Sequence, residues 1–231
     1  MPKPMPIIIL GTGGSSIDIL DAIRDVNDAA GRDLYKCVGF LDDDESKHGQ
    51  SVSGLTVLGP IASAAKHADA RFINGISSPT WFWKRDHIIA AAGIPPERFE
   101  TIVHPRASVS RAATVGRGVA ILAGATVCAG AHVGDHVTIL PACIVSHDCR
   151  IGDYTTMAGG ACVSGSVRVG RCCYLGTRCA VREKLTIGDL CLVGMGSVVL
   201  SDVPENTVVV GNPARALRKT REEGDGGAAR E

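Results

Sequence analysis

The stretch that decides the fold is VGDHVTILPACIVSHDCRIGDYTTM, residues 133–157, in which an apolar residue returns at every sixth position. The same step of six runs from Val103 to Val199 without an insertion. A helix would repeat near 3.6 residues and a simple strand near 2, so neither explains this period. A parallel β-helix does, because each short strand and its corner take six residues and the apolar position points into the prism. We therefore predict a three-faced prism in which residues eighteen apart are stacked.

A second recurrent position follows each apolar position by four residues and carries small or compact side chains. Five of the nine cysteines occupy it: Cys143, Cys149, Cys173, Cys179 and Cys191. No two cysteines are spaced as C-x-x-C, and an odd number argues against a closed set of disulfides. We interpret these five as compact apolar filler of the prism. Cys162 and Cys172 are predicted to point outward, and no histidine is placed to activate either of them as a nucleophile.

The first hundred residues follow a different pattern. PIIIL (6–10) reads as a buried strand, GTGGSS (11–16) as a glycine-rich turn, IDILDAIRDVNDAA (17–30) as an amphipathic helix and YKCVGFLDDD (35–44) as a second strand. Two more strands and the helix around WFWKRDHIIAAAG complete a small Rossmann-like α/β unit over residues 1–100. A glycine turn at a helix N-terminus can hold a phosphate on its backbone N–H groups. The unit is too short for the double mononucleotide fold, and Ser16 replaces the last glycine of G-x-G-x-x-G, so a nicotinamide cofactor is not expected.

Charge and hydropathy exclude several classes of partner. Lysine plus arginine and aspartate plus glutamate each number 24, so no net charge favours nucleic acid or an anionic membrane. The N-terminal segment lacks the features of a signal peptide, and the longest uncharged apolar stretch, residues 118–131, is too short to cross a bilayer. We expect a soluble, cytoplasmic protein without membrane insertion.

The combination of the two parts resembles the hexapeptide-repeat sugar-nucleotide N-acetyltransferases, such as the UDP-4-amino-sugar and perosamine N-acetyltransferases of bacterial glycan biosynthesis. The matching motifs are the glycine turn, GFLDD (39–43), IVHPRASVS (102–110), SHDCRIGDY (146–154) and VVVGNPARALRK (208–219). The resemblance implies a left-handed β-helix over residues 101–204, a C-terminal segment near CoA over residues 205–231, and a homotrimer with acyl-donor sites between prisms. It also implies transfer of acetyl from acetyl-CoA to the 4-amino group of a nucleotide-linked 4-amino-4,6-dideoxy sugar.

His147 is the candidate catalytic residue. It occupies neither inward position of its hexad, so its imidazole projects from a corner of the prism. Asp148 can fix the imidazole tautomer and raise its basicity, and Gly165, eighteen residues on, can offer a backbone N–H to an oxyanion. The resemblance also places the catalytic histidine here. We predict that His147 is a general base in direct transfer without an acyl-enzyme.

The remaining site residues are carried over from the resemblance. Gly13, Gly14 and Ser15 would contact the phosphates of the sugar nucleotide, and Asp42 or Asp43 its base or ribose, with UDP favoured over dTDP or GDP. Relatives often have histidine and glycine where this chain has Ser15 and Ser16. For CoA, the predicted contacts are Gly176, Thr177, Gly194 and Met195 along the pantetheine, and Gly211, Asn212, Pro213 and Ala214 near the adenine. A short basic helix carrying Arg215, Arg218 and Lys219 would meet CoA phosphates, before a polar tail.

Several alternatives stay open. The glycines of the prism could simply serve tight corners. The enzyme could transfer acyl groups to a hydroxyl of serine or of a sugar, or the protein could be a non-catalytic trimer that binds a sugar nucleotide and does not need His147. No metal is expected, because the spacing of His132, His136 and His147 does not match the γ-carbonic anhydrase pattern.

Overall fold

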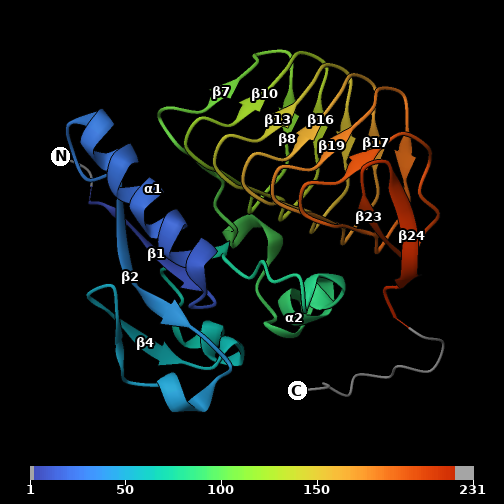
Figure 1. Cartoon of the computed structure of the whole chain (residues 1–231). Coiled ribbons are helices and arrows are strands. Elements are labelled where there is room, and N and C mark those ends of the chain that lie inside the picture. Colours follow the sequence, from blue (N-terminus) through green and yellow to red (C-terminus); the bar gives the residue numbers. More distant parts are fainter. Residues whose placement is uncertain (1–2, 222–231) are drawn as a thin grey trace.

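The computed structural model describes residues 3–221 as a small α/β unit followed by a long prism (Figure 1). The first unit has a five-stranded sheet in the order β3-β4-β2-β1-β5, parallel except for the β3–β4 pair. Its elements are β1 (Met5–Leu10), α1 (Gly14–Ala30), β2 (Tyr35–Leu41), β3 (Ser51–Val52), β4 (Leu55–Gly59), β5 (Arg71–Asn74), α2 (Arg85–Ala91) and 3-10 turns at Glu45–Lys47, Ile61–Lys66, Phe82–Lys84 and Pro96–Arg98.

The apolar run of β1 is unbroken because both faces of the sheet are covered. Ile7 and Ile9 pack with α1 on one side, whereas Ile8 and Leu10 pack with Ile89 of α2 on the other. All four β1 residues are fully buried. A strand buried on both faces needs no polar alternation. Because β1 and β2 are parallel, their carboxyl ends meet at one edge of the sheet, where the glycine turn and the run of aspartates begin.

The prism is a parallel β-helix with three faces, as the period of six predicts. The chain visits three sheets in turn, and within residues 102–199 every pair of stacked strands is eighteen residues apart. Face 1 consists of β7 (Ser108–Val109), β10 (Thr126–Val127), β13 (Ile144–Val145), β16 (Cys162–Val163), β19 (Ala180–Val181) and β22 (Val198–Val199). Face 2 consists of β8 (Thr114–Val115), β11 (His132–Val133), β14 (Arg150–Ile151), β17 (Arg168–Val169) and β20 (Thr186–Ile187).

The third face packs against the first unit, and we call it the covered face. Its strands are β6 (Ile102–Val103), β9 (Ala120–Ile121), β12 (Thr138–Ile139), β15 (Thr156–Met157), β18 (Tyr174–Leu175), β21 (Leu192–Val193), β23 (Thr207–Gly211) and β24 (Ala214–Lys219). Ile102 and Ala120 share a core cluster with α1, and the Phe82 ring lies 6.2 Å from that of Tyr174. Since β23 continues this sheet, the prism's hydrogen-bonded ladder extends past residue 204.

The five cysteines at the second recurrent position are buried inside the prism, as predicted. Cys143 and Cys149 donate from Sγ to the carbonyl oxygens of Ala158 and Ser164, at 3.1 and 3.0 Å. Burial raises the pKa of Cys143 to about 12, so this thiol stays protonated near neutral pH. Cys172, which was predicted to point outward, is fully buried beside Asp86 of α2.

The predicted basic helix after residue 214 is also wrong. Residues 214–219 form β24, an antiparallel strand on the free edge of β23. β23 extends the ladder of β21, and the turn at Asn212 and Pro213 reverses the chain, so that β24 satisfies backbone groups that β23 would otherwise leave unpaired. The polar tail predicted beyond this point lies outside the described residues.

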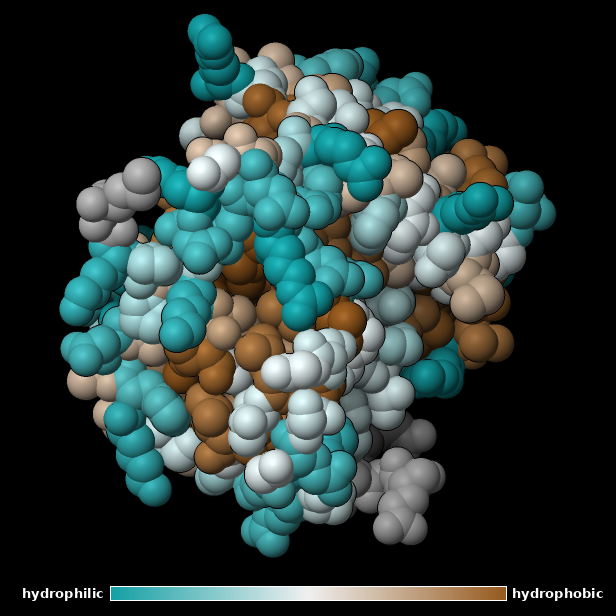
Figure 2. Space-filling model, turned by 90° about the vertical axis from the view of Figure 1, so that its left-hand side faces the viewer, coloured by the Kyte–Doolittle hydropathy of each residue, from teal (hydrophilic) through white to brown (hydrophobic). Residues whose placement is uncertain are grey.

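Between residues 3 and 221, no helix has the length and hydropathy needed to span a membrane. On the side of the molecule that Figure 2 shows, apolar residues form patches separated by hydrophilic side chains.

His136 is buried where the two parts meet. Its ring stacks on that of Tyr154 at 4.9 Å and meets the edge of Phe99 at 4.4 Å. Burial, and next the positive charge of Arg85, lower the pKa of His136 to about 4. The imidazole is therefore neutral in the folded protein across the physiological pH range.

We expect this histidine to make stability depend on pH. In the unfolded chain it takes up a proton below about pH 6.5, whereas the folded form resists protonation until about pH 4, so stability is full above 6.5 and falls as the pH drops. Between about pH 7 and pH 5, urea unfolding should show a loss of roughly 2 kcal/mol from this group. His136→Asn is the control, because asparagine tolerates the left-handed backbone there (φ 57°) and does not titrate. Equal losses in both proteins would exclude His136 as the cause.

Candidate functional site

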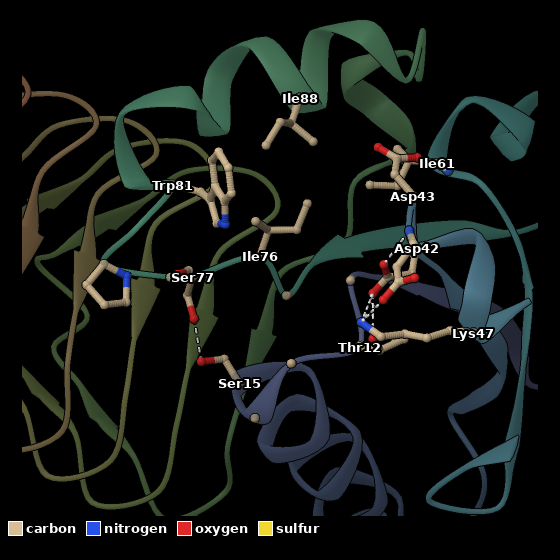
Figure 3. Close-up of a pocket in the computed structure, with 17 residues that line it drawn as sticks. Thr12, Ser15, Asp42, Asp43, Lys47, Ile61, Ile76, Ser77, Trp81 and Ile88 are labelled. Atoms are coloured by element: carbon tan, nitrogen blue, oxygen red, sulfur yellow. Dashed lines mark hydrogen bonds and ion pairs between the residues drawn. The ribbon is translucent and has the colours of Figure 1, made fainter. Parts of the chain in front are cut away.

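A cavity of about 830 Å³ lies at the carboxyl ends of β1 and β2 (Figure 3). It has an acidic end with Asp42 and Asp43 and a hydroxyl end with Ser15 and Ser77, and side chains around α2 lie over it. Its walls come from residues 11–15, 42–44 and 75–79, with Lys47, Ile61, Trp81 and Ile88. The structure thus brings all five predicted nucleotide-contacting residues to one cavity.

The glycine turn leaves the N-terminus of α1 bare. A Cβ atom added to Gly13 or Gly14 would have no other atom within 4 Å, so packing does not require glycine at either place. Within residues 3–221, the N–H groups of Gly14 and Ser15 have no hydrogen-bond partner, and the first turn of α1 has no acidic residue. These donors and the positive end of the helix dipole suit an anion such as a phosphate.

Ser16 stands where the nucleotide fingerprint has its last glycine, and Gly75 explains how it fits. The Ser16 side chain is fully buried, and a Cβ on Gly75 would collide with its hydroxyl. In the nucleotide fingerprint, a glycine in the helix permits the close approach of helix and strand. Here the glycine that follows β5 permits it instead.

The two aspartates at the acidic end are held differently. Asp42 accepts a hydrogen bond from the Thr12 hydroxyl, and its carboxylate lies 3.6 Å from Lys47 Nζ. Asp43 accepts from the backbone N–H of Ile61 at 2.9 Å through Oδ1. The contact that fixes Asp43 uses only one of its two oxygens. Carboxylate oxygens at this end can accept hydrogen bonds from a sugar hydroxyl or a base.

His147 and Asp148 form a pair on the corner between faces 1 and 2. His147 Nδ1 lies 2.9 Å from Asp148 Oδ2, and the two side chains are 63% and 66% exposed. Asp148 adopts a left-handed backbone (φ 58°), which aspartate tolerates. With Nδ1 donating to the carboxylate, Nε2 is the nitrogen that can accept a proton.

Gly165 lies directly beneath this imidazole. A Cβ there would collide with the His147 ring, so the position must be glycine for the ring to lie as it does. Its N–H makes no hydrogen bond within the described part of the chain, but the residue is buried by the imidazole. The open N–H expected from the sequence is thus covered in this side-chain conformation.

The predicted catalytic corner and the cavity are on opposite sides of the prism. The first unit packs on the covered face, and in a three-faced prism the corner between faces 1 and 2 is the one opposite that face. No residue of the 146–166 segment lines the cavity. Within one chain, His147 therefore cannot reach a ligand held there.

The predicted pantetheine contacts lie on a different corner, between the covered face and face 1. Gly176 and Gly194 have packing reasons of their own: a Cβ on the first would be 2.6 Å from Met195 N, and on the second 2.7 Å from the Val210 side chain. Thr177 and Met195 are exposed, Met195 by 80%. Only the latter two therefore present side chains to an approaching molecule.

The predicted adenine contacts lie at the end of the prism. Pro213 and Ala214 line a second cavity of about 540 Å³ together with Arg215, whereas Gly211 and Asn212 are exposed in the adjoining turn. This cavity is lined mainly by apolar side chains, with one cationic residue, Arg215, and one acidic residue, Asp202. Among residues 3–221, no three histidine, cysteine or acidic side chains gather as a metal site would require.

Comparison with known proteins finds no matching family model and no matching curated sequence. Among solved structures, the chain is similar to PerB from Caulobacter crescentus in complex with CoA and GDP-perosamine, with 26% identity, a TM-score of 0.78 and coverage of 92% of this chain and 97% of that one. It is also similar to the acetyltransferase domain of PglB from Neisseria gonorrhoeae in complex with acetyl coenzyme A, with 27% identity, a TM-score of 0.76 and coverage of 93% and 100%. The resemblance to sugar N-acetyltransferases is confirmed. The expectation of an acetyl-CoA-dependent enzyme is confirmed with it.

WeeI from Acinetobacter baumannii shares the fold, with 23% identity, a TM-score of 0.77 and coverage of 92% and 100%. In the present chain, sequence reasoning missed Lys47, Ser77 and Trp81 of the cavity. Lys47 stands in a run of polar residues, and Trp81 precedes an apolar helix. The local sequence pattern therefore gave no reason to single out either residue. Only Ser77 had a signal, because it follows the end of a parallel strand at the edge where ligands bind.

Proposed function

We propose that this chain transfers the acetyl group of acetyl-CoA to the 4-amino group of a nucleotide-linked 4-amino-4,6-dideoxy sugar. The observation that carries the proposal is the His147–Asp148 pair, whose 2.9 Å contact leaves Nε2 available on an exposed corner. A base in that state is what amide formation from a thioester requires.

The reaction needs a base at one step. The neutral amine attacks the thioester carbonyl, and the resulting tetrahedral intermediate carries a cationic nitrogen. His147 Nε2 accepts a proton from that nitrogen, the C–S bond breaks, and CoA leaves as a thiolate that is then protonated. Asp148 stabilises the imidazolium through Nδ1. When the imidazole turns aside to meet the amine, the Gly165 N–H is free to donate to the oxyanion.

The cavity suits the nucleotide part of the acceptor. The bare N–H groups of Gly14 and Ser15 would hold the diphosphate, and Asp42 or Asp43 would accept hydrogen bonds from the ribose or base. The hydroxyl end and Trp81 would then meet the sugar. Such a pocket favours a nucleotide-linked acceptor over free serine.

A complete site requires two copies of the chain. The cavity and His147 lie on opposite sides of the prism, so His147 of one copy would serve the cavity of a neighbour. A closed ring of three copies supplies three equivalent sites of this kind. In such a ring, CoA would lie between prisms, with its adenine toward the second cavity.

Gly14→Ala should separate stability from binding. The added methyl group meets no other atom within 4 Å and replaces glycine inside α1, so the free energy of unfolding should rise by roughly 0.5–1 kcal/mol. The same methyl group enters the space where a diphosphate would approach the backbone, so affinity for the nucleotide should fall about tenfold. Thermal unfolding and calorimetric titration with UDP and GDP measure the two effects. Unchanged affinity would remove the turn from the binding site.

The decisive experiment is a mass-resolved assay of the purified protein with acetyl-CoA and UDP-, dTDP- and GDP-linked 4-amino-4,6-dideoxy sugars. Gain of one acetyl group on one of these sugars would establish both the reaction and the nucleotide base of the acceptor. If CoA binds but no sugar is acetylated, the acceptor lies outside this class, and hydroxyl acceptors become the next candidates. If nucleotide sugars bind and no acetyl acceptor is found, the non-catalytic alternative gains support.

A further inference from the structure

A buried arginine joins the cavity to the prism. Arg85, the first residue of α2, is fully buried. Its Nη1 donates to the carbonyl oxygen of Tyr154 at 2.6 Å and to the Thr156 hydroxyl at 2.8 Å. Its Nη2 donates to the carbonyl oxygen of His136 and to the Thr138 hydroxyl, both at 3.0 Å. All four acceptors belong to the prism, and none is a carboxylate.

This arrangement holds α2 in one position. A guanidinium is costly to bury, and its four acceptor oxygens offset that cost only when the hydrogen-bond geometry is right. Burial lowers the pKa of Arg85 to about 10, so the side chain is still charged at neutral pH. A shift of α2 along the covered face would leave a buried cation without acceptors, and such a state is strongly disfavoured.

The same segment forms one wall of the cavity. Trp81 precedes Arg85 by four residues and Ile88 follows it by three, and both side chains lie over the cavity in Figure 3. The opposite wall, residues 11–15 and 42–44, stands on the strands of the first unit itself. One wall therefore stands on the sheet alone, whereas the other packs on the sheet through Ile88 and Ile89 and is also held to the prism through Arg85.

We propose that Arg85 is a positioning residue for the sugar nucleotide, because it fixes the wall formed by residues 76–88 at the distance that closes the cavity around its ligand. The inference rests on the proposed function for the identity of that ligand, but not for the anchoring itself. Arg85 touches no substrate and acts through Trp81 and Ile88.

A second link between α2 and the prism provides a matched control. Asp86 accepts from Arg171 Nη2 at 2.9 Å, but Arg171 is 50% exposed. Exposed ion pairs contribute little to stability. Arg171→Met therefore changes the same residue type across the same interface without leaving a fully buried group unsatisfied, because Asp86 is 18% exposed and still accepts from the His87 N–H.

The test compares Arg85→Met with Arg171→Met and the wild type. In Arg85→Met, hydrogen exchange of residues 76–91 should become faster while that of residues 42–61 stays unchanged. The KM for the sugar nucleotide that serves as acceptor should rise about tenfold, while the KM for acetyl-CoA stays within about twofold. Arg171→Met should match the wild type in all three measurements.

Two results would overturn the proposal. One is unchanged exchange of residues 76–91 in Arg85→Met, and the other is faster exchange throughout with both KM values raised together, which marks general destabilisation. If Arg85→Met does not fold, Thr138→Val combined with Thr156→Val removes two of the four acceptors and should give the same pattern in weaker form. Exchange needs no substrate, so it decides the anchoring role even if every sugar nucleotide fails as an acceptor.

Discussion

His147→Ala should lower kcat by roughly 10²–10⁴-fold and leave the KM for both substrates within a few-fold, because a general base acts in the transition state and contributes little to binding. The fold should be unaffected, since the side chain is 63% exposed. Asp148→Asn, which the left-handed backbone tolerates, should give a smaller loss, because the amide still orients the ring but does not stabilise the imidazolium.

The chain offers a matched control in His132. This histidine is also exposed on the prism, where its backbone is stacked on that of Arg150 in the next coil. Its Nδ1 lies 2.6 Å from the Thr114 hydroxyl, and it has no carboxylate partner within the described residues. His132→Ala should keep full activity. Turnover unchanged in His147→Ala would remove that residue from the mechanism, and an equal loss in both variants would indicate a general effect on the prism.

Two inactive variants should restore activity when they assemble together. In a copy carrying His147→Ala the cavity is intact, and in a copy carrying Gly14→Leu the cavity is blocked while the base is intact. If each site takes its cavity from one copy and its base from a neighbour, a random mixture of equal amounts should recover about a quarter of the wild-type activity. Each variant alone should be inactive.

Co-expression with two different affinity tags, followed by purification on both, isolates the mixed oligomers. In a mixed ring of three copies, one of the three sites joins an intact cavity to an intact base, so the purified mixed oligomers should show about a third of the wild-type activity. Purified homo-oligomers mixed without exchange of subunits are the control and should remain inactive. Activity that stays absent in verified mixed oligomers would place the cavity and the base in the same copy. It would then contradict the inference from the geometry of the prism.

The prism could be predicted from the sequence because its contacts repeat. Each inward residue between Val103 and Val199 has the same surroundings as the residue eighteen positions away, so a local period reports a non-local structure. His147 and Asp148 could be singled out for a related reason, since the two side chains that interact are adjacent in the chain. The edge strand β24 was missed because its only reason to be extended is the free edge of β23.

The anchoring of α2 had no signal in the sequence. Arg85 stands in the segment WFWKRDHI, where a charged residue normally marks the exposed side of a helix. Its acceptors are backbone carbonyls and threonine hydroxyls between 51 and 71 residues away. Such acceptors are present in every sequence, so nothing distinguishes these four until the fold brings them together. The cavity wall at Trp81 and Ile88 was missed for the same reason.

The register of eighteen residues has a consequence for changes in the length of this chain. One residue inserted between Ile151 and Val169 would offset every later strand from its partner and turn inward side chains outward. Eighteen residues inserted at a corner would instead add one complete turn and leave each ladder continuous. The distance from the corner that carries His147 to the C-terminal cavity can therefore change only in whole turns, each of roughly 4.8 Å. Evolution or design could adjust that span to longer or shorter donor molecules only in such steps.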